Sequence, residues 1–376
     1  MATTQLAPPD VASTNMRPFR LTRARVVALV LGVAALIAVA VEARHGAVAG
    51  RIRNPAVVGA PRPIEPLFGF DGWITLHQIG LVVMMVTLVT VFVVGWRRKP
   101  GNPVLLMVLA TTLLVWQDPI MNWAPYAVYN PQLWHWPETW PLVSLSPTVE
   151  PFIVIGYATF YMAPFFPASR LLRRIQASKP VDHFVWRHPL VTLSVLILGI
   201  GFVFDAGLEI FLVRTQLYIY SHVIPWGSYA AGKWYQFPLI WESALVSTVM
   251  IPAGVLLHKD DTGKTQAEKL AHRSPWFRTR PALGAFAVMF LVINVGYFVY
   301  GGAFALMKDT GAASSVACPW PYPEAKVYDP QGFYEEAGQA GPYFPGIWSG
   351  WPSAQPDGRP DVVAPVNGGR CGAAGG

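Results

Sequence analysis

The sequence predicts an all-α protein, a transmembrane bundle of about seven helices. The chain is 53% hydrophobic and only 13% charged, whereas soluble domains carry about 25% charged residues. It also contains seven apolar segments with roughly the 17 to 25 residues that a helix needs to cross a bilayer. These segments lie at about 24–43, 73–95, 102–123, 150–168, 189–213, 235–257 and 282–306.

The distribution of cationic residues predicts the orientation of this bundle. If the N-terminus is inside, the inner segments hold 18 of the 28 Lys and Arg residues, and inner loops are the ones enriched in these residues. We therefore expect the N-terminus inside and the C-terminus outside. The net charge of +7 is then mostly a signal of topology, since no basic stripe or recognition motif indicates a nucleic-acid partner.

The two ends of the chain differ from the bundle in composition. We expect a disordered tail at 1–23, the bundle at 24–308 and an outer tail rich in Pro, Gly and aromatic residues at 309–376. The first apolar segment could instead be a signal peptide with a cleavage site at 38–40, but its length favours a retained anchor. Cys318 and Cys371 both lie in the outer tail, where a disulfide and two free thiols both remain open.

The stretch FVFDAGLEIFLVRTQLYIY, residues 202–220, carries two acids inside an apolar span. Asp205 and Glu209 are four residues apart, so on a helix they share one face and differ in depth by about 6 Å. An acid in hydrocarbon is costly unless it faces a partner or a polar cavity, and it therefore indicates a functional site. The structural alternative is an ion pair between helices within a satisfied polar network.

Three further acids lie near the outer ends of other predicted spans. Glu242 is about two turns into the sixth span, Asp118 is near the end of the third, and Glu150 is at the start of the fourth. Asp118 precedes a proline, which frees a helix carbonyl, and with Asn122 it could help to satisfy the freed group. Glu150 could cap its helix. These structural roles stay open beside a role in binding.

Polar residues of other types occur at the same depth. His77 is one turn into the second span, and Arg214 and Tyr218 follow the fifth span. Arg214 is five residues from Glu209, so the two do not face each other on one helix, and we expect Arg214 to reach a carboxylate on another span. A lone His near a helix end is more often structural than catalytic. Together these groups predict a cavity in the outer half of the bundle.

The inner loop HKDDTGKTQAEK contains a Gly-Lys-Thr but lacks the remainder of a phosphate-binding loop. That motif needs a glycine five residues before Gly263, where this chain has His258. We expect Asp260, Asp261 and Gly263 to form a turn that ends one helix and starts another. The His and acidic residues show no metal-ligand spacing, and we expect no redox, metal or nucleotide cofactor.

Four motifs occur in an order that resembles the AveC-like spirocyclase family of actinobacterial membrane proteins. They are WQDPIMNW, FVFDAGLEIFLVRTQLYIY, YQFPLIWES, and DDTGKT with Glu268 soon after it. The resemblance covers about residues 70–310 and implies an integral protein of the bacterial plasma membrane. It also implies an enzyme like the one that names the family, which closes a dihydroxyketone of a polyketide pathway into a spiroketal and can also dehydrate. A shared family does not by itself establish the same reaction.

The residues fit acid/base chemistry in a pocket that excludes water. Forming a spiroketal needs an acid, a base and stabilisation of an oxocarbenium-like cation, to which aromatic faces can contribute. Burial can keep one carboxyl neutral near pH 7 while another stays ionised. We predict that Asp205 or Glu209 is the acid and that the other, or Glu242, is the base. The expected substrate-binding residues are His77, Asp118, Asn122, Glu150, Arg214 and Tyr218, of which His77, Arg214 and Tyr218 orient groups.

Two other functions fit the same residues. A protein that binds or transports a lipid or another hydrophobic metabolite could use the acids as a pathway or a proton relay. Internal repeats would favour transport, and we find none between the halves. A structural scaffold in a lipid-metabolism complex would need no site. The expected partners are the bilayer and a hydrophobic small molecule. The sequence does not indicate which oligomeric state the protein adopts.

Overall fold

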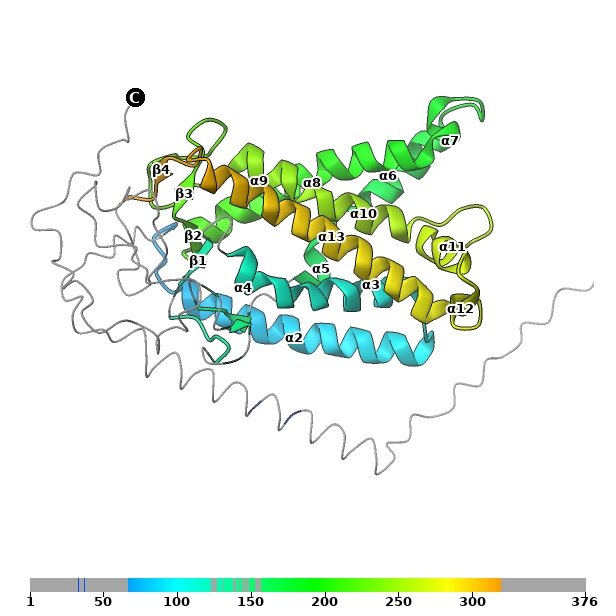
Figure 1. Cartoon of the computed structure of the whole chain (residues 1–376), viewed down its shortest axis with the longest axis horizontal. Helices are drawn as coiled ribbons and strands as arrows, with labels where there is room; N and C mark the ends of the chain where they lie inside the picture. Colours follow the sequence, from blue (N-terminus) through cyan, green and yellow to red (C-terminus); the bar gives the residue numbers. More distant parts are fainter. Residues whose placement is uncertain are drawn as a thin grey trace, which may run out of the picture. The chain divides into compact units, whose positions relative to one another are not determined.

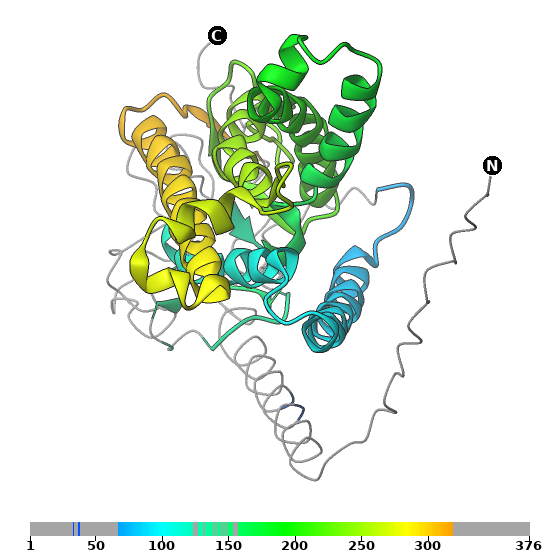
Figure 2. The same ribbon diagram turned by 90° about the vertical axis from the view of Figure 1, so that its right-hand side faces the viewer.

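The described part of the protein is a helical bundle. The computed structural model describes residues 33, 37, 67–122, 127–130, 132–137, 140, 142–143, 146, 149–152 and 157–318. From residue 67 onward these residues belong to one compact unit. Its long helices run side by side, as the lengthwise view in Figure 1 and the end-on view in Figure 2 show.

Five segments of this unit are long and apolar enough to cross a membrane. They are α2 (Trp73–Arg98), α3 (Pro103–Thr112) with the 3₁₀ helix η2 (Leu113–Gln117) and α4 (Asp118–Met121), α8 (Pro189–Arg214), α9 (Leu239–Leu245) with α10 (Ser247–Leu257), and α13 (Pro281–Asp309). The helices α3, α8 and α13 each begin with a proline. Proline is favoured there because the first helical nitrogen needs no hydrogen-bond partner. Five of the seven predicted spans are thus confirmed as long apolar helical segments.

The other two predicted spans have different outcomes. The first, 24–43, falls almost wholly outside the described residues. The prediction of a single helix over 150–168 is wrong, because the chain passes through α5 (Tyr157–Phe160), a turn at 161–164 and α6 (Phe165–Ala177). Pro164 and Pro167 explain the break, since a proline inside a helix removes one hydrogen bond and clashes with the preceding turn. The predicted orientation of the termini stays a prediction.

Two further segments are interrupted along their length. The helix α3 tightens into η2 before Asp118 and Pro119, and α9 gives way to α10 at Val246. Irregular backbone at membrane depth is tolerated where it is buried in protein or lines a cavity. Asp118 directly follows the first of these interruptions, and Glu242 lies one helical turn before the second.

Short strands join the loops at the end of the bundle where α4 and α8 end (Figure 1). The strand β1 (Ala127–Tyr129) pairs with β2 (Tyr218–Tyr220), and β3 (His222–Val223) pairs with β4 (Ser315–Val316), both antiparallel. The prediction of an all-α protein did not include these two small sheets. Cys318, just after β4, is buried and disulfide-bonded, and Cys371 lies outside the described residues.

The opposite end of the bundle carries α7 (Phe184–Arg187), α11 (Gln266–His272) and α12 (Pro275–Arg278). The predicted turn between two helices is confirmed, because it separates α10 from α11. Gly263 adopts a positive φ of 75° there, and its amide donates to the carbonyl oxygen of Asp260 at 2.9 Å. Thr265 and Glu268 then form a capping box that starts α11, which satisfies two free helix amides.

The apolar core lies mainly between α3, α8, α10 and α13. A close backbone approach in this core involves Gly296 of α13 and Thr248 of α10. A Cβ atom at Gly296 would lie 2.6 Å from the carbonyl oxygen of Thr248, and the Thr248 hydroxyl donates to the carbonyl oxygen of Gly296 at 3.1 Å. A small residue at a helix contact permits this approach.

We expect Gly296→Leu to destabilise the protein by about 1 to 3 kcal/mol, because a larger side chain must push α10 away from α13. Thermal unfolding of the purified full chain in mild detergent measures the effect. The matched control is Gly302→Leu on the same helix, where an added Cβ would meet no atom within 4 Å. Equal unfolding temperatures for the two variants would contradict the proposed close packing.

Candidate active site

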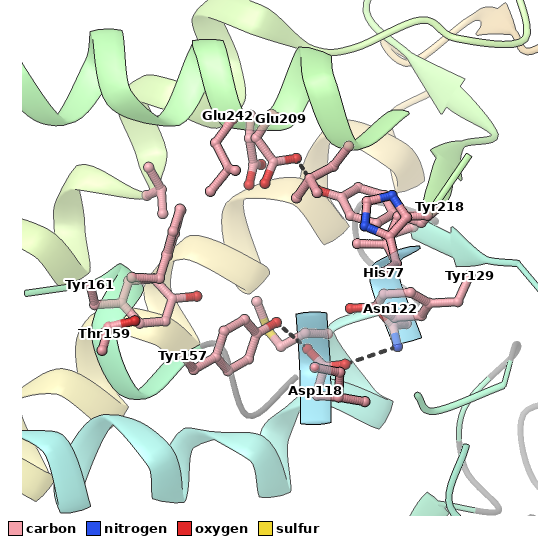
Figure 3. A pocket seen from close by; sticks show the side chains of 18 of the residues that line it. His77, Asp118, Asn122, Tyr129, Tyr157, Thr159, Tyr161, Glu209, Tyr218 and Glu242 are labelled. Atoms are coloured by element: carbon pink, nitrogen blue, oxygen red, sulfur yellow. Dashed lines mark hydrogen bonds between the residues drawn. The ribbon is translucent and has the colours of Figure 1, made fainter. Parts of the chain in front are cut away.

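A cavity of about 370 Å³ lies near the end of the bundle that carries β1 and β2. This volume is within the range of about 300 to 1,000 Å³ that is common for ligand pockets. Much of its wall is apolar, with Leu81 from α2, Phe160 from α5 and Leu208 from α8 as examples. The polar residues that line it are His77, Asp118, Asn122, Tyr129, Tyr157, Thr159, Tyr161, Glu209, Tyr218, Tyr220, Glu242 and Tyr297. Figure 3 shows Glu209 and Glu242 on one wall, with Asp118 on the facing wall.

Glu209 is held by two phenols from the strand that follows its helix. The hydroxyl of Tyr218 donates to Glu209 Oε2, and the hydroxyl of Tyr220 donates to the same oxygen at 3.1 Å. Burial, and then the charge of Glu209, raise the pKa values of both tyrosines well above the usual value. Both phenols therefore remain protonated donors, which favours the charged form of the carboxylate that accepts from them.

Glu242 has one satisfied oxygen and one without a partner. The hydroxyl of Tyr300 donates to Glu242 Oε1 at 2.6 Å. No hydrogen-bond partner among the described residues reaches Glu242 Oε2, although the side chain is buried and lines the cavity. An unpaired charged oxygen in an apolar wall is costly. The neutral acid is therefore the form that suits this position.

Asp205 lies behind the cavity rather than in its wall. It is fully buried and one helical turn before Glu209, but it is absent from the residues that line the cavity. It interacts with Glu209 and with the Ser243 hydroxyl, yet neither of its oxygens has a hydrogen bond of normal geometry to a described residue. Asp205 therefore adds to the electrostatic environment of Glu209 without facing the cavity.

Asp118 forms the facing wall and accepts hydrogen bonds from three side chains. The Tyr157 hydroxyl donates to Asp118 Oδ1, and the Tyr297 hydroxyl approaches the same oxygen at 3.3 Å. Asn122 Nδ2 lies 3.4 Å from Asp118 Oδ2 and 2.6 Å from Glu150 Oε1. Several donors that converge on one carboxyl group favour its ionised form.

Glu150 stands behind Asn122, in the loop before α5. It is buried and does not line the cavity. Burial, and then the negative charge of Asp118, raise the pKa of Glu150 well above its usual value. A charged Asp118 thus disfavours the charged form of Glu150, and Asn122 connects the two carboxyl groups.

The cavity holds acids without a balancing cation among its described residues. None of the described lining residues is a Lys or an Arg. The ion pair between described residues is Lys269 with Asp260, at 2.7 Å and at the opposite end of the bundle. Asp205, Glu209 and Glu242 are close enough for their charges to interact. Three buried like charges without a cation are unfavourable, so at least one of these three carboxyl groups must be uncharged.

His77 connects α2 to the rest of the cavity wall. Its Nε2 atom lies 2.8 Å from the Thr215 hydroxyl oxygen, and the Thr215 hydroxyl lies 2.8 Å from the carbonyl oxygen of Phe211. Because that hydroxyl has one proton and donates it to the backbone, its oxygen accepts from Nε2–H of His77. The remaining ring nitrogen, Nδ1, is then an acceptor.

The carboxyl groups on facing walls permit proton donation and proton removal around one bound molecule. A family model described as spirocyclase AveC-like matches residues 96–328 of the chain. The chain belongs to the AveC-like spirocyclase family. The match confirms the resemblance that the motifs predicted. Searches among curated proteins and among solved structures found no significant match.

The family match covers the two acidic walls of the cavity but not most of α2. It begins at residue 96, so most of α2, including His77, lies before it. The segments that carry Asp118, Glu209 and Glu242 all lie within it. In this AveC-like protein the acidic part of the cavity thus belongs to the matched region, whereas most of α2 is outside it.

The structure brings six of the nine predicted site residues to the cavity wall of this AveC-like protein. They are His77, Asp118, Asn122, Glu209, Tyr218 and Glu242. Asp205 and Glu150 lie behind the wall. Arg214 forms no ion pair with a described acid, because its guanidinium lies over the ring of Tyr235, 4.2 Å from the centroid.

Several tyrosines in this wall were not singled out from the sequence of the AveC-like protein. Tyr157 and Tyr297 contact Asp118, and their hydroxyls are 3.1 Å apart. Tyr300, three residues after Tyr297, does not line the cavity itself, but its hydroxyl donates to Glu242. Their position in apolar segments could have identified them. A phenol that is buried in such a segment usually has a hydrogen-bond partner.

Proposed function

We propose that this protein is a membrane-embedded enzyme that closes a polyketide-like or lipid-like substrate into a spiroketal, or dehydrates it, by acid/base catalysis. The observation that carries the proposal is the presence of Asp118, Glu209 and Glu242 on facing walls of one largely apolar cavity. Membership of the AveC-like spirocyclase family supports a spirocyclase-type reaction.

The cavity suits a lipophilic substrate with a few oxygen atoms. Its apolar side chains, such as Leu81, Met84 and Phe204, can bury carbon chains, and this burial supplies most of the binding free energy. Its polar groups gather where α4, α8 and α9 face the cavity. A cyclisation needs this arrangement, because the two hydroxyls and the ketone must be held near one another while the chain folds back.

The proposed reaction balances with the loss of one water molecule. One substrate hydroxyl adds to the ketone, losing its proton to a carboxylate while the carbonyl oxygen gains a proton from an acid. The resulting hemiketal hydroxyl takes a proton and leaves as water, which forms an oxocarbenium ion. The second hydroxyl attacks this ion and loses its proton to a carboxylate. Acid and base return to their starting forms, and no carbon is oxidised or reduced overall.

The contacts favour a specific division of roles. Glu242 is the acid, because its side chain lines the cavity and its Oε2 has no hydrogen-bond partner among the described residues. Asp118 is the base, because donors from Tyr157, Tyr297 and Asn122 stabilise its ionised form. Glu209, held by Tyr218 and Tyr220, supplies negative charge that stabilises the cation. This division differs from the assignment made from the sequence, in which Asp205 or Glu209 was the acid.

Identification of a co-purified ligand tests the proposal. We expect the full chain, purified in mild detergent, to yield on extraction a ketone-diol or its cyclised product by mass spectrometry. Leu208→Trp, which narrows the cavity, should reduce the amount recovered at least tenfold. Val203→Trp is the matched control on the same helix, because Val203 is 73% exposed and does not line the cavity.

Other results of this extraction experiment would contradict the proposed enzyme function. An unmodified lipid without ketone or diol groups, lost in Leu208→Trp and kept in Val203→Trp, would favour a carrier over an enzyme. An equal amount of ligand in both variants would place its binding outside the cavity. Recovery of no ligand from the wild-type chain would contradict the proposal in its present form.

A further inference from the structure

A second hollow, with a volume of about 850 Å³, lies at the opposite end of the bundle. It is bounded by α6, α7, the first turn of α8 and the turn between α10 and α11. Leu190 of this crevice and Glu209 of the acidic cavity are on the same helix, 19 residues apart, which corresponds to about 28 Å. The crevice is therefore a separate feature, and any ligand it binds is independent of the reaction proposed for the acidic cavity.

The lining of this crevice has an apolar part and a cationic part. The apolar part includes Val104, Phe165, Phe166, Leu190, Val191 and Leu257. The charged residues are the five cations Arg170, Arg173, Arg187, Lys259 and Lys269 and the two acids Asp260 and Asp261. Asp260 is already paired with Lys269, so the other cations outnumber the remaining acid.

The two parts of the lining adjoin each other where α7 is followed by α8. Arg187 is at the end of α7, and Leu190 and Val191 follow within the first turn of the apolar helix α8. Phe166 and Val191 are exposed, as expected of side chains that face hydrocarbon. Arg170 and Arg173 are three residues apart on α6, so they point from one helix face. Apolar and cationic groups in this order fit a molecule with acyl chains and a negative headgroup.

We propose that this crevice binds an anionic phospholipid, with its phosphate among Arg170, Arg173 and Arg187 and its acyl chains along Phe166, Leu190 and Val191. Basic pockets between membrane helices bind such headgroups. Arginine suits this role because its planar guanidinium group can donate two hydrogen bonds to one phosphate. The apolar part of the lining favours a lipid over free phosphate, because inorganic phosphate has no acyl chain that could contact the apolar residues.

The test measures binding of dihexanoyl phosphatidylglycerol, a short-chain anionic lipid, to the full-length protein in a nonionic detergent by calorimetric titration. We expect saturable binding that weakens about 30-fold in Arg170→Gln/Arg173→Gln, since each cation contributes about a fivefold factor near an anionic headgroup. The matched control is Arg174→Gln/Lys179→Gln. These two cations are exposed on or just after the same helix but do not line the crevice, so the control should bind as the wild type does.

Three results would overturn this inference. Equal losses of affinity in the two double variants would mean that the basic surface as a whole attracts the lipid and that the crevice is not a specific site. Equal affinity for dihexanoyl phosphatidylcholine, which has no net charge, would remove the role of the cations. Binding of inorganic phosphate with similar affinity and the same dependence on Arg170 and Arg173 would assign the site to phosphate alone. Thermal unfolding of each variant verifies that the protein remains folded.

Discussion

Glu242→Gln is expected to lower kcat by about 10²- to 10⁴-fold, which is the usual contribution of a general acid or base. Glutamine has nearly the same shape, and its carbonyl oxygen can still accept the hydrogen bond from Tyr300, which is 2.6 Å in the wild type. An amide cannot release a proton as a carboxylic acid does. The substitution therefore removes the proposed acid while it preserves the contact that orients this side chain.

Two measurements check the expectation for Glu242. Turnover of the ligand identified by mass spectrometry should fall while the thermal unfolding temperature stays close to that of the wild type. The ligand extracted from the variant should be the open-chain form, heavier than the product by one water. Asp182→Asn serves as the control, because it also converts an acid to an amide but at an exposed position away from the cavity. Near-normal turnover in Glu242→Gln would eliminate this residue as the acid.

Asp118→Asn is expected to lower kcat by about 10²- to 10³-fold and also to destabilise the protein by about 1 to 3 kcal/mol. The activity falls because the substitution removes the proposed base. The stability falls because the new amide would place a donor against Asn122, which lies 3.4 Å from Asp118 Oδ2, and an unsatisfied buried donor carries a cost of this size. Rate measurements and thermal unfolding on the same preparations give both numbers.

A series of variants around Asp118 separates its effect on catalysis from its effect on stability. Tyr297→Phe removes the longer of two phenol contacts, 3.3 Å, and should have the smallest effect on kcat. Tyr157→Phe removes the closer contact and should have an intermediate effect, since the carboxylate keeps its charge with fewer donors. Activity losses that follow the losses in stability across all three variants would indicate a purely structural role for Asp118.

The sequence predicted a site at Glu209 and Glu242 because a carboxyl group in an apolar span is costly wherever that span packs, and both residues line the cavity. It did not distinguish Asp205 from Glu209. Residues four apart on a helix share a face, yet Glu209 lines the cavity and Asp205 does not. Which of the two faces the hollow depends on how α9, with Ser243, packs against α8, and the local spacing contains no information about that contact.

Local sequence patterns also failed to predict the contact of Arg214 and the backbone of the fourth predicted span. Arg214 was expected to reach a carboxylate, but a ring 21 residues later in the chain, Tyr235, lies under its guanidinium. The apolar composition of 150–168 suggested one helix, although Pro164 and Pro167 were visible in it. Composition reports whether a segment prefers hydrocarbon, whereas proline decides whether its backbone can remain helical.

The sequence by itself determined that the chain contains several long apolar helices, that acids lie within them and that the chain resembles the AveC-like spirocyclases. These properties follow from local composition, because the preference of a segment for a bilayer is close to a sum over its residues. Only the tertiary structure decided which acids face one cavity and which tyrosines hold them. Tyr297 and Asp118 are 179 residues apart in the chain, and their contact arises from the packing of α13 against α3 and η2. Such a contact depends on the shapes of both surfaces, which no local pattern specifies.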